Sequence, residues 1–98
     1  MRRSEEEIKS ASKVFKALSH PKRLQIACLL VDQGTQSQKQ LIEEMQIPQS
    51  TVSRHLEPLR RVGLVHAQRQ AQEVHFSLNG NILNQLLDTM CDWFHEEV

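Results

Sequence analysis

The sequence predicts a mainly helical α+β domain in which five helices are combined with one two-stranded β-hairpin. Three observations lead to this fold class. Apolar residues recur at helical spacing in five segments, capping residues or Pro and Gly mark the segment ends, and two short alternating segments precede the last helix. Because 98 residues correspond to one domain, we expect a single unit over residues 1–98, in the order helix, helix, helix, helix, strand, strand, helix.

The first two predicted helices are separated by a short break. Ser4 and Glu7 match a capping box at the start of a helix over residues 4–18. Its apolar residues recur at helical spacing: Ile8, Ala11, Phe15 and Leu18. Pro21 begins the second helix, because proline suits a first helical turn, and Gly34 ends it. Apolar residues surround this helix almost completely, which is typical of a buried helix. They are Leu24, Ile26, Ala27, Cys28, Leu29, Leu30 and Val31.

A third and a fourth helix are joined by a short turn. Ser37 and Gln40 form a second capping box at the start of a helix over residues 37–45. The turn over residues 46–48 follows, and its proline opens a fourth helix that ends near residue 62. The core face of this fourth helix is expected at Val52, Leu56 and Leu59.

Two strands and a last helix complete the chain. Residues 65–69 and 73–78 alternate between polar and smaller or apolar side chains, as the strands of a hairpin do. The tip over residues 70–72 lacks the usual Gly or Asn, so the sequence does not specify the turn type. The last helix is expected over residues 81–97. Its apolar stripe consists of Leu83, Leu87, Met90, Cys91 and Phe94, with Leu86 beside it.

The charges are unevenly distributed, although the formal net charge is zero. Between residues 48 and 70 four arginines face one acid, whereas residues 71–98 contain acids and no Lys or Arg. A basic middle followed by an acidic end is compatible with one surface that faces DNA.

Several classes of protein do not fit the sequence. No apolar run is long enough for a membrane span. The first residues, Met-Arg-Arg followed by Ser4 and three glutamates, lack the apolar segment of a secretory signal. We therefore expect a cytoplasmic protein without a membrane partner. Two cysteines are too few for a disulfide scaffold, and no Cys-x-x-Cys indicates a zinc ribbon.

Two helices joined by a short turn and followed by a hairpin describe a winged helix-turn-helix. The helix-turn-helix is expected over residues 37–62 and the wing over residues 65–78. In this arrangement the second helix enters the major groove of double-stranded DNA, and its N-terminal residues meet the base edges. The residues expected there are Gln49, Ser50, Thr51, Ser53 and Arg54. Gln pairs bidentately with adenine and Arg with guanine. The alternative interpretation of this cluster is a solvated polar helix face.

Further basic residues are candidates for contacts with the DNA backbone. Arg69 in the wing is expected at a phosphate, and Lys39 near the backbone. Arg60 and Arg61 are either phosphate contacts or solvated charges, and the sequence favours neither. His55 lies close to the core face, which favours a packing role over a base contact.

Three segments, over residues 17–24, 48–56 and 59–65, read ALSHPKRL, PQSTVSRHL and LRRVGLV. In this order they resemble the corresponding segments of ArsR/SmtB-type repressors, and the resemblance covers nearly the whole chain. It implies a homodimer with its interface on the helices over 4–18 and 81–97, which represses until an inducer releases it from an operator. The last helix is also more apolar than a lone winged helix needs. A symmetric dimer places two recognition helices about 34–36 Å apart, so we expect an imperfectly palindromic operator.

Pro48 and Pro58 depart from the resemblance. Pro48 stands where the family usually has Ser, which a first helical turn tolerates. Pro58 removes a backbone hydrogen bond inside the fourth helix and can bend it.

The resemblance also indicates where a metal would bind in such a protein. One family site is a Cys-x-Cys before the turn, and residues 37–43 contain no cysteine here. Another site uses positions that correspond to Gly80, Ile82, Trp93 and Glu96, of which only Glu96 can bind a metal. We therefore expect no dedicated metal site and no cofactor.

Cys28 and Cys91 resemble the cysteines that sulfur- and redox-responsive members place on the second and last helices. Cys91 stands about one turn earlier than that pattern. If the two Cα atoms come within about 7 Å, a disulfide or polysulfide bridge would pull the last helix onto the second and change the DNA-binding geometry. The alternative is that both cysteines are apolar filler, since cysteine is among the most buried residue types. The sequence leaves the inducer unknown.

A winged helix also serves as a protein-interaction module that does not bind DNA, and such a module would lack the steep salt dependence of phosphate contacts. An enzyme would need a thiol nucleophile and a base, for which Cys28 with His20 or His55 is the available set. No glycine-rich loop or exposed cleft accompanies that set, so we do not expect an enzyme.

Overall fold

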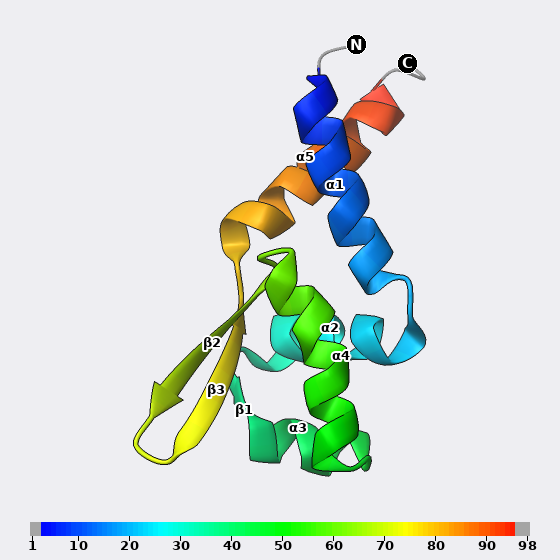
Figure 1. Cartoon of the computed structure of the whole chain (residues 1–98). Coiled ribbons are helices and arrows are strands. Elements are labelled where there is room, and N and C mark those ends of the chain that lie inside the picture. Colours follow the sequence, from blue (N-terminus) through cyan, green and yellow to red (C-terminus); the bar gives the residue numbers. More distant parts are fainter. Residues whose placement is uncertain (1–2, 96–98) are drawn as a thin grey trace.

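Five helices and a three-stranded antiparallel sheet form the part of the chain that the structure describes (Figure 1). The structure is a computed structural model that describes residues 3–95, with side chains described as far as Cys91. The elements are α1 Glu5–Leu18, α2 Pro21–Gln33, β1 Gln36–Ser37, α3 Gln38–Met45, α4 Gln49–Arg61, β2 Val65–Gln70, β3 Glu73–Leu78 and α5 Gly80–His95. The predicted fold class and order of elements are confirmed, with one additional strand.

The additional strand, β1, lies at the edge of the sheet. The strand order is β1-β3-β2, and Gln36 and Ser37 pair with Phe76 and His75 of β3. A strand of two residues is too short to show an alternating pattern, so the sequence did not reveal it. In the wing, the pairing of β2 with β3 extends to the pair Gln70–Glu73. The turn is therefore one residue shorter than predicted: it consists of Ala71, which is left-handed with φ 57°, and Gln72.

The helix-turn-helix has the predicted caps, with small shifts at the helix starts. Ser37 is the N-cap of α3: its Oγ accepts from the Gln40 N–H at 3.1 Å, and the Gln40 Oε1 accepts from the Ser37 N–H at 2.8 Å. Pro48 is the N-cap of α4 rather than its first helical residue. The helix then runs as one element through Pro58 to Arg61.

The core lies between α2, α3, α4 and the sheet. Its largest fully buried side chains are Ile26, Val52, Leu41, Leu56, Leu59 and Leu64. The prediction that α2 is buried on all sides is wrong. Leu24 and Val31 are 51% and 58% exposed, and Cys28 is exposed as well. The other side of α2, with Ile26, Ala27 and Leu30, is buried.

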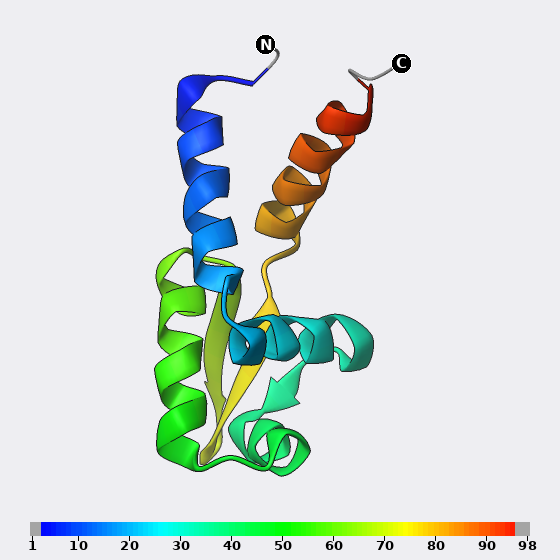
Figure 2. The ribbon, with the colours of Figure 1, turned by 90° about the vertical axis from the view of Figure 1, so that its right-hand side faces the viewer.

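The helices α1 and α5 form an arm that extends from this body and carries both chain ends (Figures 1 and 2). The molecule measures 48 × 23 × 21 Å as a result. Within the arm Val14 and Leu86 are buried, whereas three large apolar side chains are exposed: Ile8, Leu87 and Met90. On α5 it is thus Leu86, and not the predicted stripe, that faces the chain's own core. Phe94 of that stripe lies outside the described side chains. No helix in the described part has the length and apolar character needed to cross a membrane.

Candidate nucleic-acid interface

The helix-turn-helix and the wing tip meet at the end of the molecule that lies opposite the arm. In both views α3, the N-terminal end of α4 and the turn between β2 and β3 lie at this end (Figures 1 and 2). The antiparallel pairing of β2 with β3 carries the tip outward from the core. One side of the molecule therefore presents a helix end next to a projecting hairpin.

The recognition helix α4 has one buried and one exposed face. Val52, His55, Leu56 and Leu59 are buried, which confirms the predicted core face. Of the residues predicted to meet base edges, four are exposed and Thr51 is half-buried. The exposed ones are Gln49, Ser50, Ser53 and Arg54. The packing of the apolar face thus turns the predicted polar cluster toward solvent.

The N-terminus of α4 is open. Pro48 provides no side-chain cap, and its carbonyl accepts from the N–H groups of Thr51 and Val52 at 3.0 and 3.1 Å. The first helical residues, Gln49 and Ser50, therefore direct their N–H groups outward without a side-chain acceptor. Such N–H groups, together with the helix dipole, favour a phosphate.

One side-chain hydrogen bond joins α3 to the recognition helix. The Gln38 Nε2 donates to the Ser53 Oγ at 2.8 Å. Sequence reasoning missed Gln38, because a partner 15 residues away leaves no local pattern. The only sequence signal near it was the capping box at Ser37, which fixes where α3 begins.

The structure separates the basic candidates into two groups. Lys39 is exposed on the first turn of α3, and Arg69 is exposed on β2 next to the wing tip, so both belong to the end that carries the polar cluster. Arg60 and Arg61 are exposed at the other end of α4, about 18 Å along the helix axis from Gln49. Arg61 also forms an ion pair with Glu57 at 3.5 Å. The structure therefore does not bring these two arginines together with the base-reading cluster.

His55 packs against the N-terminus of α2. Its ring centroid lies 4.5 Å from that of His20, the N-cap residue of α2, whose Nδ1 accepts from the Lys22 N–H. His55 is only 6% exposed, and its Nδ1 has no hydrogen-bond partner among the described residues. Burial lowers the pKa of His55, and the charge that His20 carries when it is protonated and the positive charges of Arg54, Arg23 and Lys22 lower it further. The histidine is therefore held neutral and acts as a packing residue between α2 and α4.

This lowered pKa predicts that the protein loses stability in mild acid. Above the ordinary histidine pKa of about 6.5 the side chain is neutral in both states, and its packing stabilises the fold fully. As the pH falls below that value, the unfolded chain binds a proton that buried His55 resists, so the free energy of unfolding decreases until the folded pKa is passed. Urea unfolding at several pH values between 7.5 and 5 measures how steeply the free energy of unfolding changes with pH. His55→Phe should reduce this slope, whereas the exposed-site control His66→Gln should not. An unchanged slope in His55→Phe would contradict the assignment.

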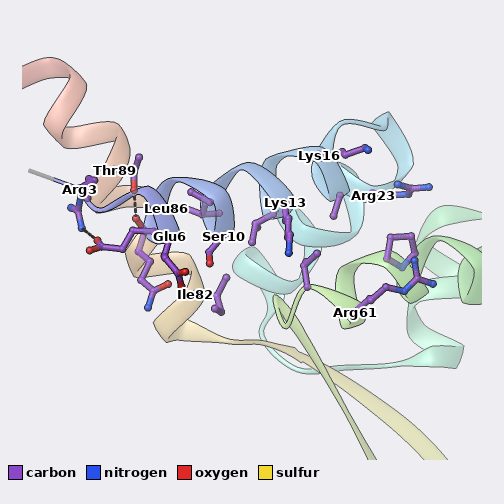
Figure 3. Close-up of a pocket in the computed structure, with 17 residues that line it drawn as sticks. Arg3, Glu6, Ser10, Lys13, Lys16, Arg23, Arg61, Ile82, Leu86 and Thr89 are labelled. Atoms are coloured by element: carbon purple, nitrogen blue, oxygen red, sulfur yellow. Dashed lines mark hydrogen bonds and ion pairs between the residues drawn. The ribbon is translucent and has the colours of Figure 1, made fainter. Parts of the chain in front are cut away.

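A groove of about 1190 Å³ lies between α1, α5 and the C-terminal half of α4 (Figure 3). Lys16, Arg23 and Arg61 lie at one end, and Arg3, Glu6 and Thr89 at the other. Its lining includes apolar side chains of the three helices and of Val62, the C-cap residue of α4: Ala11, Val14, Ala17, Pro58, Val62, Ile82 and Leu86. A molecule that filled this groove would contact both the arm and the recognition helix.

The two cysteines are free and exposed. Their exposure does not fit the interpretation of both as buried filler. In both views α5 extends beside α1 and away from α2 (Figures 1 and 2). Among the described side chains no three His, Cys, Asp or Glu gather as a metal site. Of the four positions compared with family metal sites, the Trp93 side chain and Glu96 lie outside the described residues.

Comparison with known proteins identifies relatives in sequence. Residues 20–67 match the model of the family described as bacterial regulatory protein, arsR family. The HTH-type transcriptional regulator YgaV of Escherichia coli is 35% identical over 80 residues, which cover 82% of this chain and 81% of that protein. The transcriptional activator HlyU of Vibrio cholerae is 35% identical over 77 residues, which cover 79% of this chain and 70% of that protein.

Solved structures share the fold over most of their length. HlyU of Vibrio cholerae has a TM-score of 0.75 at 32% identity, covering 95% of this chain and 96% of that one. A structure described as its reduced form has a TM-score of 0.74 at 34% identity, and the match covers 84% of this chain and 86% of that one. The transcriptional repressor PagR of Bacillus anthracis has a TM-score of 0.72 at 30% identity, covering 81% and 95%. An activator and a repressor therefore both resemble this chain.

Proposed function

Because this chain belongs to the ArsR family and is a DNA-binding transcriptional regulator, we propose that it is a homodimeric repressor that binds a palindromic operator. The observation that carries the proposal is the exposed polar end of α4 beside the wing tip. A protein that binds DNA through this end occupies the operator, and repression follows from that occupation. The relatives are transcriptional regulators, and we propose no catalytic activity for this chain. Operator binding takes place where the DNA is, which in bacteria is the cytoplasm.

The residues divide into base-reading and backbone-binding groups. Gln49 and Arg54 read base edges in the major groove, where Gln pairs with adenine and Arg with guanine. Ser50, Thr51 and Ser53 offer hydroxyls to bases or phosphates, and the open N-terminus of α4 binds a phosphate. Arg69 in the wing and Lys39 on α3 bind the adjacent backbone. The domain roles follow: residues 37–62 and 65–78 contact DNA, and residues 4–18 and 81–97 hold the dimer together.

The dimer is supported by the apolar surface of the arm. Ile8, Leu87 and Met90 are 38%, 49% and 37% exposed in the single chain. A two-fold axis at the arm buries the same surface on both copies. Dimerisation also buries apolar surface that a single chain of this size cannot bury alone.

Selection of bound sequences from random duplex DNA tests the proposal. We expect an imperfect palindrome whose half-sites are centred about 34–36 Å apart, one turn of the double helix. Affinity should fall with salt at a log–log slope of about −0.9 for each phosphate contact. Failure to enrich any sequence, or an affinity that does not respond to salt, would instead favour a protein-interaction module.

A thiol switch is the second part of the proposal, and the exposure of Cys28 and Cys91 favours it. Two thiols that form a disulfide give up two electrons and two protons to an oxidant such as a peroxide. With an organic tetrasulfide the two thiols exchange instead, so that a bridge of four sulfur atoms forms and two organic thiols leave. A bridge between α2 and α5 would bring the helices together and reorient the recognition helix. Because the arm extends away from α2, this requires α5 to move until the Cα atoms lie within about 7 Å.

Oxidation is therefore expected to weaken operator binding by about fivefold or more, the lower end of a coupling of 1–3 kcal/mol between sites. Operator affinity is measured with dithiothreitol, then with hydrogen peroxide or an organic tetrasulfide, for the native chain and for Cys28→Ser and Cys91→Ser. Each serine variant should bind alike under all conditions. A native protein whose affinity is unchanged after mass spectrometry confirms a bridged product would refute the switch.

A further inference from the structure

The hydrogen bond between Gln38 and Ser53 links α3 to the DNA-facing side of α4. We propose that Gln38 is a positioning residue of the DNA interface: its amide holds the Ser53 hydroxyl so that the hydroxyl donates to DNA. This inference rests on the proposed function, in which the N-terminal half of α4 enters the major groove.

The Gln38 amide is presented from a well-anchored backbone. Gln38 is the first residue of α3, and the capping box of Ser37 and Gln40 holds that end of the helix. Ser37 is 5% exposed, and its backbone pairs with His75 of β3. The side chain of Gln38 is half-buried. Strand β3 of the wing thus holds the start of α3 through Ser37, and Gln38 connects this start to the recognition helix.

The direction of this hydrogen bond determines what Ser53 offers to DNA. A serine hydroxyl has one proton and two acceptor lone pairs. The Gln38 Nε2 donates to the Ser53 Oγ at 2.8 Å, so one lone pair is occupied and the hydroxyl proton remains available. Because Ser53 is exposed, that proton can be donated to an acceptor on a base edge, such as N7 of a purine.

Without Gln38 the hydroxyl is free to turn. A serine within a helix can donate to the backbone carbonyl one turn earlier, and Ser53 would then present lone pairs rather than a proton to DNA. The expected consequence is a loss of preference for base acceptors at one position of each half-site. Binding to the DNA backbone elsewhere would be unaffected.

A double-mutant cycle tests the inference with Gln38→Met, Ser53→Ala and the double variant of the full chain. Methionine has a similar length but cannot donate to the hydroxyl. Affinities are measured for the selected operator, for operators changed at each half-site base, and for a random duplex. We expect each single variant to weaken operator binding about 3- to 10-fold, the range of one net hydrogen bond. The double variant should be no weaker than Ser53→Ala. Random-duplex affinity should stay within about twofold of the native value.

Gln38→Glu reverses the hydrogen bond, because a carboxylate only accepts, and the Ser53 hydroxyl then directs its proton toward the carboxylate and away from DNA. It should flatten the same base preference that Gln38→Met and Ser53→Ala flatten. The positioning role would be overturned if Gln38→Met weakened binding to all sequences equally or did not weaken it at all. It would also be overturned if Gln38→Met caused the same loss when Ser53 is absent. A native protein that binds no selected duplex would instead refute the proposed function itself.

Discussion

Replacing Leu87 by glutamate is expected to yield a monomer whose affinity for a palindromic operator is lower by about 100-fold or more. Leu87 is 49% exposed in the single chain, and Met90 lies one turn further along the same side of α5. A carboxylate in the proposed interface would be buried without a partner. Two linked recognition helices gain about 10² to 10⁴ in avidity over one, and the monomer forfeits that gain. Sedimentation equilibrium and fluorescence anisotropy measure the two effects.

A matched control is available on the same helix. Gln85→Glu adds the same charge at an exposed position on the opposite side of α5, where it faces the groove between α1 and α4. This variant should remain dimeric and bind the operator within about twofold of the native protein. Leu87→Glu should still bind an isolated half-site with native affinity. If Leu87→Glu remains dimeric with full operator affinity, the dimer does not use this face of the arm.

Arg54→Ala is expected to weaken operator binding by about 1–3 kcal/mol and to relax base preference at one position of each half-site. Arg54 is exposed on α4 beside buried His55, and no ion pair holds it among the described residues. It is therefore free to form the bidentate contact with guanine. Affinities for operators that carry each of the four bases at the guanine position measure the loss of preference.

Arg61→Ala separates base reading from backbone binding. Arg61 lies at the far end of α4 and pairs with Glu57 at 3.5 Å, with both side chains more than half exposed. If it contacts a phosphate, its loss should weaken all sequences alike and reduce the salt slope by about 0.9. If it is a solvated charge, its loss should leave operator affinity unchanged. A change of base preference in Arg61→Ala, together with a uniform loss in Arg54→Ala, would reverse the two roles.

Much of the candidate interface was predictable because its signals are local. The capping box at Ser37 and Gln40 and the turn before Pro48 set the start of both helices of the helix-turn-helix. The spacing of Val52, Leu56 and Leu59 assigned the core face of α4, and so the polar cluster opposite it. The role of His55 followed from the same periodicity, since its position adjoins that face.

Other features depended on contacts between distant segments and were not predictable from spacing. The apolar residues of α2 suggested a helix buried on all sides, yet no described element covers Leu24, Cys28 and Val31. The resemblance placed the stripe on α5 at a dimer interface, whereas periodicity alone does not say whether a stripe faces its own chain or another copy. In the single chain Leu86 is buried and Leu87 is exposed, so the side of α5 that carries Leu86 faces its own chain.

The sequence by itself determined the order of the five helices and the wing hairpin, most of their ends to within a residue or two, the polar tip of the recognition helix and the family. These properties follow from caps, turns and periodicity, which act between residues close in the chain. Only the tertiary structure decided that β1 joins the wing, that Gln38 reaches Ser53, that His20 packs against His55, and that both cysteines are exposed. Each of these depends on which segments meet in space and which side of a helix another element covers, and neither is set by local spacing.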